Sequence, residues 1–168
     1  MPSVRSLVTL FYVSILTAAC SAAPMVMAPS KSIVIKNKIS GSLARVRVEQ
    51  PASATYGDPA LSAIAMSTWK NEVEAACDSS RLFDESSGTQ IEIIIAVQRF
   101  EPSIWAYDHY ADAKYRLIDK RTGATLKEIE VSSIGHDSTF EGAARSRNAL
   151  SKSVSLNIEG FLKSFDKE

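Results

Sequence analysis

One segment, Gln90–Phe100, constrains the fold more than any other part of the chain, because it is apolar on both sides of a strand. Side chains alternate across a strand, so one side carries Ile91, Ile93, Ile95 and Val97. The other side carries Glu92, Ile94, Ala96 and Gln98. Apolar residues on both sides are typical of a strand inside a sheet that is covered, at least in part, on both faces. We therefore expect a central strand here.

Further strands are predicted on either side of this segment. Residues 106–118 and 124–134 alternate and are joined by a turn that ends in Gly123, which predicts a hairpin. The alternation of the second segment slips near Glu128, which indicates a bulge. Nearer the N-terminus, Ser32–Ile39 and Ala44–Val48 also alternate and are β-branched, so both are expected to be strands.

Two amphipathic helices complete the pattern. Asp58 followed by Pro59 is a favourable helix start, and apolar residues at helical spacing continue it for about twenty residues. A second apolar stripe at the same spacing follows Phe140 and continues to the C-terminal end. Two such helices need one apolar surface, and one face of a sheet supplies it. The predicted fold is α+β: one mixed, mainly antiparallel sheet of about four strands with two helices packed on one face. The first strand enters the sheet through a right-handed crossover formed by the first helix.

The composition is that of an ordinary globular domain. The chain has 168 residues, of which 45% are apolar, and it carries 19 basic and 19 acidic side chains. This apolar share excludes intrinsic disorder, and the zero net charge argues against a nucleic-acid partner. The two cysteines are too few for a disulfide framework.

The N-terminus carries a targeting segment. Leu7–Leu16 is an uncharged run of ten residues after a single Arg5. As a helix it would extend only about 15 Å, half of a hydrocarbon core of roughly 30 Å. A signal peptide therefore fits this run better than a transmembrane helix does.

The end of this run, Leu16-Thr17-Ala18-Ala19-Cys20, resembles the lipobox of bacterial lipoproteins, although Thr17 stands where a branched apolar residue is usual. The resemblance implies cleavage before Cys20 and acylation of its thiol and amine. The alternative is an ordinary secretory signal, cut after Ala19 or after Ala23, where Pro24 would hinder the peptidase. The expected organisation is a lipoprotein signal peptide over residues 1–19, the lipidated Cys20 with a flexible tether over 20–31, and a single α+β domain over 32–168.

The order of elements from Asp58 to Phe165 resembles a group of uncharacterised bacterial envelope lipoproteins. The residues that carry this resemblance are Tyr115–Asp119 before the Thr122-Gly123 turn, and Ala143, Ala149 and Asn157-Ile158 in the last helix. The architecture is also similar to small modules of curli-secretion and Tol-associated periplasmic proteins. The resemblance implies no catalytic residues.

No catalytic residues, metal ligands or cofactor are predicted. Asp108 and His109, with Asp112 nearby, suggest a metal site, but neighbours in a strand point to opposite faces and do not converge on one ion. A Gly-x-Ser-x-Gly elbow is missing, and no serine or cysteine has an evident base partner. Cys77 lies on the apolar side of the first helix, where a buried free thiol is expected.

One surface is a candidate for binding. Ile94 is expected on the face of the sheet that the helices do not cover, where water is expected. Tyr110 shares this face by the parity of the next strand. Together with Trp105 they form a predicted apolar patch for self-association or for an envelope protein partner. We therefore expect a non-enzymatic binding or structural module, held at the membrane through lipid on Cys20, in the periplasm and at the outer membrane. The alternatives are a small periplasmic enzyme and a secreted protein without lipid.

Overall fold

The structure is a computed structural model that describes residues 25–50, 55–56, 59–100 and 106–166. Its elements, in chain order, are β1 (Ser42–Glu49), β2 (Thr55–Tyr56), α1 (Pro59–Ser80), β3 (Gln90–Phe100), β4 (Asp108–Asp119), β5 (Thr125–His136) and α2 (Gly142–Lys163). The first helix begins at the predicted Pro59, and its predicted cap Asp58 lies outside the described residues.

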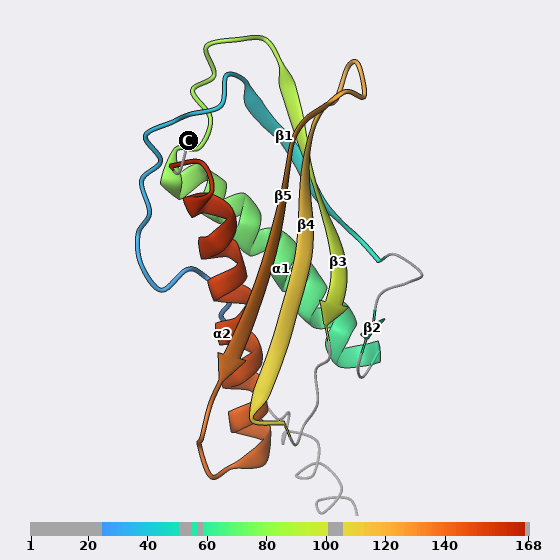
Figure 1. Ribbon diagram of the computed structural model, residues 1–168, viewed down its shortest axis with the longest axis vertical. Helices are drawn as coiled ribbons and strands as arrows, with labels where there is room; N and C mark the ends of the chain where they lie inside the picture. Colours follow the sequence, from blue (N-terminus) through green and yellow to red (C-terminus); the bar gives the residue numbers. More distant parts are fainter. Residues whose placement is uncertain (1–24, 51–54, 57–58, 101–105, 167–168) are drawn as a thin grey trace, which may run out of the picture.

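The sheet has the order β1-β3-β4-β5, and the short β2 pairs with the end of β3 (Figure 1). β1 runs parallel to β3 through the crossover formed by α1, whereas β3, β4 and β5 form an antiparallel meander. The mixed, mainly antiparallel sheet is confirmed, and so is the interior position of β3.

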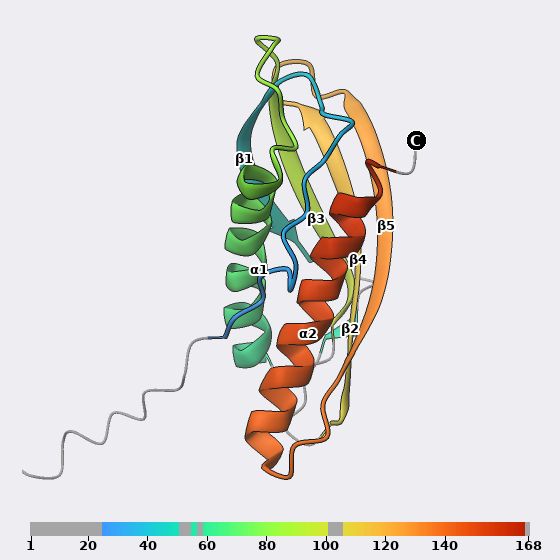
Figure 2. The ribbon, with the colours of Figure 1, turned by 90° about the vertical axis from the view of Figure 1, so that its left-hand side faces the viewer.

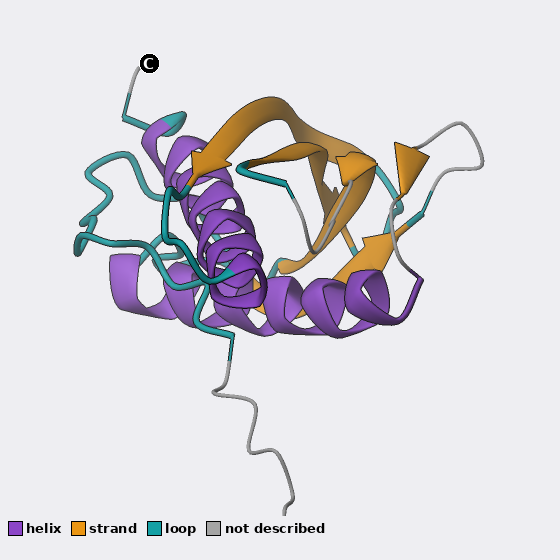
Figure 3. Ribbon diagram, turned by 90° about the horizontal axis from the view of Figure 1, so that it is seen from below, coloured by secondary structure: helices purple, strands orange, loops and turns teal. Residues whose placement is uncertain are grey.

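Both helices cover the same face of the sheet, as Figures 2 and 3 show. The main core fills the space between them and the sheet. Tyr115 of β4 stacks on Phe161 of α2 with ring centroids 4.2 Å apart. Close approach of β5 to α2 requires Gly135, because a Cβ added there would lie 2.0 Å from the carbonyl oxygen of Ala149. The predicted packing of two helices on one face is confirmed.

A chain of hydrogen bonds crosses this core. The indole N–H of Trp69 donates to the hydroxyl of Tyr115 at 3.1 Å, and this hydroxyl donates to Oδ1 of Asn157 at 2.8 Å. The amide nitrogen of Asn157 then donates to the carbonyl groups of Ala111 and Val131, at 2.6 and 2.9 Å. These hydrogen bonds connect α1, β4, α2 and β5. They satisfy polar groups that burial would otherwise leave without partners.

The sheet has irregularities at the ends of its long strands. The pairing of β3 with β4 shifts between Val97 and Arg99, so Phe100 turns to the core face and is fully buried. The pairing of β4 with β5 shifts opposite Leu126, two positions before the Glu128 at which the sequence predicts a bulge.

The predicted strand Ser32–Ile39 is wrong. Residues 25–39, which we call the strap, have no regular secondary structure apart from a bridge between Ile39 and Phe83. The strap runs between the two helices (Figure 2), and its N–H at Ile35 donates to the carbonyl of Ser80 at the end of α1. Packing explains the isoleucines of this segment, because Ile35 is 1% exposed in the core and Ile33 and Ile39 pack against the core.

The strap also corrects the predicted flexible tether over residues 20–31. Met27 is fully buried in the core, and Met25 packs against it. Ser30 donates from its N–H and its hydroxyl to Oε1 of Glu159 in α2, at 3.0 and 2.7 Å. Residues 25–31 are therefore part of the domain, whereas residues 20–24 lie outside the described residues. Within the described residues, no helix has the length and apolarity needed to span a membrane.

Candidate functional site

The face of the sheet opposite the helices carries most of the predicted partner surface, and charged side chains dominate it. Glu92 of β3 accepts from Arg45 at 2.9 Å and from Arg47 at 2.5 Å, both on β1. Glu49 pairs with Arg47 at 3.0 Å and with Arg116 of β4 at 2.5 Å. These five side chains form what we call the charge lattice.

The charge lattice covers Ile94. In the strand register, Ile94 lies between Arg47 of β1 and Arg116 of β4. Its side chain is 2% exposed, although it does not belong to the main core. The predicted face of Ile94 is correct, but its predicted exposure to water is wrong. The long alkyl portions of arginine cover neighbouring apolar surface while the guanidinium groups stay solvated, which alternation alone does not reveal.

Glu92 is the centre of the charge lattice and is itself buried. The hydrogen bond from Arg45 is the main reason that the pKa of Glu92 lies below its ordinary value, and Arg47 adds to the effect. On the other side of the face, Lys114 pairs with Glu130 at 2.7 Å and with Glu128 at 2.9 Å. The hydrogen bond to Glu130 is the main reason that the pKa of Lys114 is raised. These charges neutralise one another locally.

Tyr110 lies at the other end of this face, near the start of β4. The guanidinium carbon of Arg99 lies 3.7 Å from the centroid of the Tyr110 ring, which is a cation–π contact. Ile134 of β5 lies directly opposite Tyr110 and is 54% exposed. These residues line an open hollow of about 510 Å³, together with Asp112, Ser132 and Ser133. We call it the Tyr110 hollow.

The predicted patch of Ile94, Trp105 and Tyr110 is therefore only partly assembled among the described residues. Tyr110 is half-buried and lines the hollow, Ile94 is covered, and Trp105 lies outside the described residues. Sequence reasoning missed Ile134. The register of the hairpin would have predicted its position, because it places Ile134 directly opposite Tyr110 and on the same face.

Asp108 and His109, at the start of β4, point to opposite faces of the sheet, as predicted. Asp108 is exposed and its Oδ1 lies 2.6 Å from Nδ1 of His136, across the hairpin. His109 points to the opposite face and is 1% exposed. No group of three or more histidine, cysteine, aspartate or glutamate side chains is arranged to hold a metal ion in the part of the chain that the structure describes.

One serine does meet a base, contrary to the sequence expectation. Nε2 of His109 lies 3.1 Å from Oγ of Ser146 in α2. Their separation of 37 positions concealed the pair in the sequence. Both side chains are buried, with 1% and 6% exposure, so the pair links β4 to α2 within the domain.

Cys77 is buried on α1, as the sequence predicts, with 1% exposure. Burial raises the pKa of its thiol far above the ordinary value, so the reactive thiolate does not form at neutral pH.

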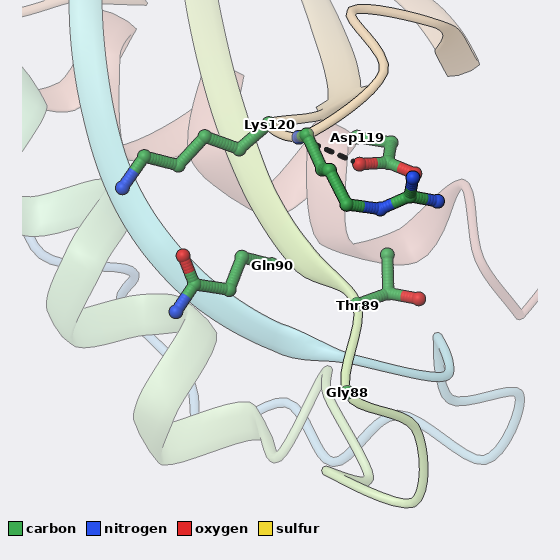
Figure 4. Close-up of a pocket in the computed structure, with 6 residues that line it drawn as sticks. Gly88, Thr89, Gln90, Asp119 and Lys120 are labelled. Carbon is green, nitrogen blue, oxygen red and sulfur yellow. Dashed lines mark hydrogen bonds between the residues drawn. The ribbon is translucent and has the colours of Figure 1, made fainter.

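A second hollow lies at the opposite end of the sheet, between the start of β3 and the β4–β5 turn (Figure 4). Its side chains include Gln90 and Lys120, and Asp119 beside them accepts from the backbone N–H of Arg121 at 2.8 Å. The same hydrogen bond is the main reason that the pKa of Asp119 is lowered. This carboxylate is thus used to close the hairpin turn.

Comparison with known proteins shows the fold. No family model and no curated protein matches the sequence. A protein of the DUF330 family from Xanthomonas campestris is similar in structure, with a TM-score of 0.53, 13% identity, and coverage of 84% of this chain and 95% of that chain. A candidate lipoprotein from Caulobacter crescentus has a TM-score of 0.44 and 13% identity, and the match covers 71% of this chain and 88% of that one.

The first of these similarities shows a shared fold, and at such low identity it shows nothing more. The resemblance to uncharacterised bacterial envelope lipoproteins rests on the sequence alone. Similarity to curli-secretion and Tol-associated modules stays a prediction.

Proposed function

We propose that the protein is a lipoprotein of the bacterial cell envelope, acylated on Cys20, with its domain in the periplasm and its anchor in the outer membrane. In this role it is a non-enzymatic binding or structural module. The observation that carries the proposal is the Leu16–Cys20 segment at the end of an uncharged run of ten residues. Three acyl chains on Cys20 exceed the two membrane signals that stable anchoring requires.

The Tyr110 hollow supports the binding role. Tyrosine and arginine are enriched at protein interfaces, and Arg99 over Tyr110 presents both beside the exposed Ile134. The remainder of the face is occupied by charges that pair with one another. We therefore propose this hollow, with the predicted Trp105, as the contact site for an envelope protein or for a second copy of the chain.

The alternative is a small periplasmic enzyme, and the pair of Ser146 and His109 is the observation that favours it most. A serine nucleophile needs a base within hydrogen-bond reach, and this pair meets that condition at 3.1 Å. Substrate must also reach the hydroxyl, and both side chains are buried. The structural role of this pair is therefore the better explanation.

Lipidation is tested by labelling cells with palmitate and comparing Cys20→Ala with Cys77→Ala, which removes the other cysteine. We expect Cys20→Ala to lose the label and to release the domain from the membrane fraction. Cys77→Ala is expected to keep both the label and the membrane association. Equal membrane retention of the Cys20→Ala variant and the wild type would overturn the lipoprotein proposal.

The binding role is tested by cross-linking in cells that produce the variant Tyr110→Ser/Ile134→Ser. We expect cross-linked complexes to be reduced while folding and lipidation are kept. Ile64→Ser is the matched control, because Ile64 is 58% exposed on α1, away from the hollow. Complexes that persist unchanged in the double variant would exclude the hollow as the interface.

A further inference from the structure

The strap fixes the start of the domain firmly to both helices. Met27 is fully buried, and Ser30 donates two hydrogen bonds to Glu159, which is 5% exposed. Burial opposes ionisation of Glu159, but the hydrogen bonds from Ser30 and Lys163 outweigh it and lower the pKa of this carboxyl. Further along, the N–H of Lys36 donates to Asp166 at 3.0 Å.

This attachment leaves little free chain between the domain and the anchor. Seven residue steps separate Cys20 from the buried Met27. Fully extended, they span at most about 25 Å. A domain acylated on Cys20 is therefore confined to the immediate vicinity of the bilayer.

The position of the strap also sets which side faces the bilayer. The described chain begins on the helix side of the molecule, away from the sheet (Figures 2 and 3). For the outer face of the sheet to lie on the bilayer, the free chain would have to pass two layers, each about 10 Å thick, and turn around an edge. The five residue steps from Cys20 to Met25, where the described chain begins, span at most about 18 Å. This is less than the two layers, so the reach favours the helix side as the one that meets the lipid.

The outward side of the strap has the chemistry that a lipid surface recognises. Met27 and Ile35 point into the domain, whereas Val26 and Val34 are 65% and 64% exposed. Between residues 25 and 41 the sequence has no acidic residue and three lysines, Lys31, Lys36 and Lys38, all of them exposed. Exposed apolar side chains among lysines favour the surface of a bilayer that contains anionic lipid.

We propose that the outward side of the strap docks on an anionic lipid surface, which orients the domain with its helices toward the bilayer and the Tyr110 hollow away from it. The inference rests on the proposed anchoring through Cys20. In this orientation the hollow is open to a partner in the periplasm, while the strap is occupied by lipid.

The orientation is tested with the mature chain, residues 20–168, which contains every described residue. Cys77 is buried, so maleimide-bearing lipid in vesicles couples at Cys20. Val34→Trp places an indole on the strap, and Ile134→Trp places one on the outer face of the sheet as the matched control. With brominated phosphatidylcholine and phosphatidylglycerol, we expect the fluorescence that Val34→Trp adds to the parent protein to be quenched, and that of Ile134→Trp to be kept.

Charge reversal tests the role of the lysines. In the Val34→Trp background, Lys31→Glu/Lys36→Glu should lose the quenching, as should vesicles without phosphatidylglycerol. Lys120→Glu/Arg121→Glu makes the same change in charge at the β4–β5 turn and should leave the quenching intact. Equal quenching of the two tryptophan variants, or stronger quenching of Ile134→Trp, would overturn the orientation. Since the anchor is attached chemically, this result does not depend on lipidation in the cell.

Discussion

The two faces of the sheet bury isoleucines of the same strand by different means. Ile93 and Ile95 point toward the helices and lie in a core of apolar side chains. Ile94, between them, points the other way and is covered by the charge lattice. All three are at most 2% exposed.

Equal burial does not imply an equal contribution to stability. Around Ile95, packed helices and strands relax only in part when atoms are removed, so a cavity remains. Around Ile94, arginine side chains with solvated ends move into the space that is left. Ile95 is thus buried by packed helices and strands, whereas Ile94 is buried by flexible side chains.

The largest expected effect comes from shortening these isoleucines one at a time. We expect Ile95→Ala to lower the free energy of unfolding by about 4 kcal/mol, since it combines lost burial with a cavity. Ile94→Ala should cost only about 1–2 kcal/mol, because Arg47 and Arg116 collapse over the smaller side chain. Urea unfolding measures both. Equal losses for the two variants would show that the charge lattice is as rigid as the helix layer.

A smaller loss is expected from the polar chain inside the helix-covered core. Asn157→Ala removes the donor to the carbonyls of Ala111 and Val131 and the acceptor of the Tyr115 hydroxyl. We expect it to lower the free energy of unfolding by about 3 kcal/mol, because these groups stay buried without partners. Tyr115→Phe, the milder control, should cost about 1–2 kcal/mol. An unchanged free energy of unfolding in Asn157→Ala would contradict this expectation, because it would require water to replace the amide as the partner of these groups.

The smallest effect concerns the charge lattice and depends on pH. The pKa of Glu92 in the folded protein lies below the ordinary value of 4.5, so the unfolded chain binds its proton first as the pH falls. The stability that Glu92 contributes is thus fully present above pH 4.5 and is lost as the pH falls through the lowered pKa. Glu92→Gln should be less stable than the wild type at neutral pH, and this difference should shrink below pH 4.5. A difference in urea midpoint that stays constant with pH would contradict this assignment.

Much of the fold could be predicted, since the elements with strong periodicity are set by local patterns. Gln90–Phe100 is a strand with the predicted bounds, and the helix that begins at Pro59 follows from the proline and the apolar spacing after it. The strap could not be predicted in this way. Ser32–Ile39 has the alternation of a strand, but among the described residues it pairs with no strand and makes only the single bridge from Ile39 to Phe83. Its inward side chains are used for packing.

The candidate site was harder to predict because it depends on neighbours from other strands. The face of Ile94 follows from parity, whereas its cover comes from Arg47 and Arg116 on two other strands. In the same way, Ile134 completes the Tyr110 hollow from a separate strand, and Ser146 reaches His109 from a helix. Spacing within one segment contains no information about such pairs.

The contacts of the strap have a consequence for the order in which parts of the domain fold. Ser30, Lys36 and Asn37 bond to residues that follow them by 129, 130 and 128 positions, at the C-terminal end of the chain. These bonds close loops of 128 to 130 positions, so they form only after residues 159–166 are available. If the chain is exported with its N-terminus first, as proposed, the domain remains incompletely folded until residues 159–166 have crossed the membrane.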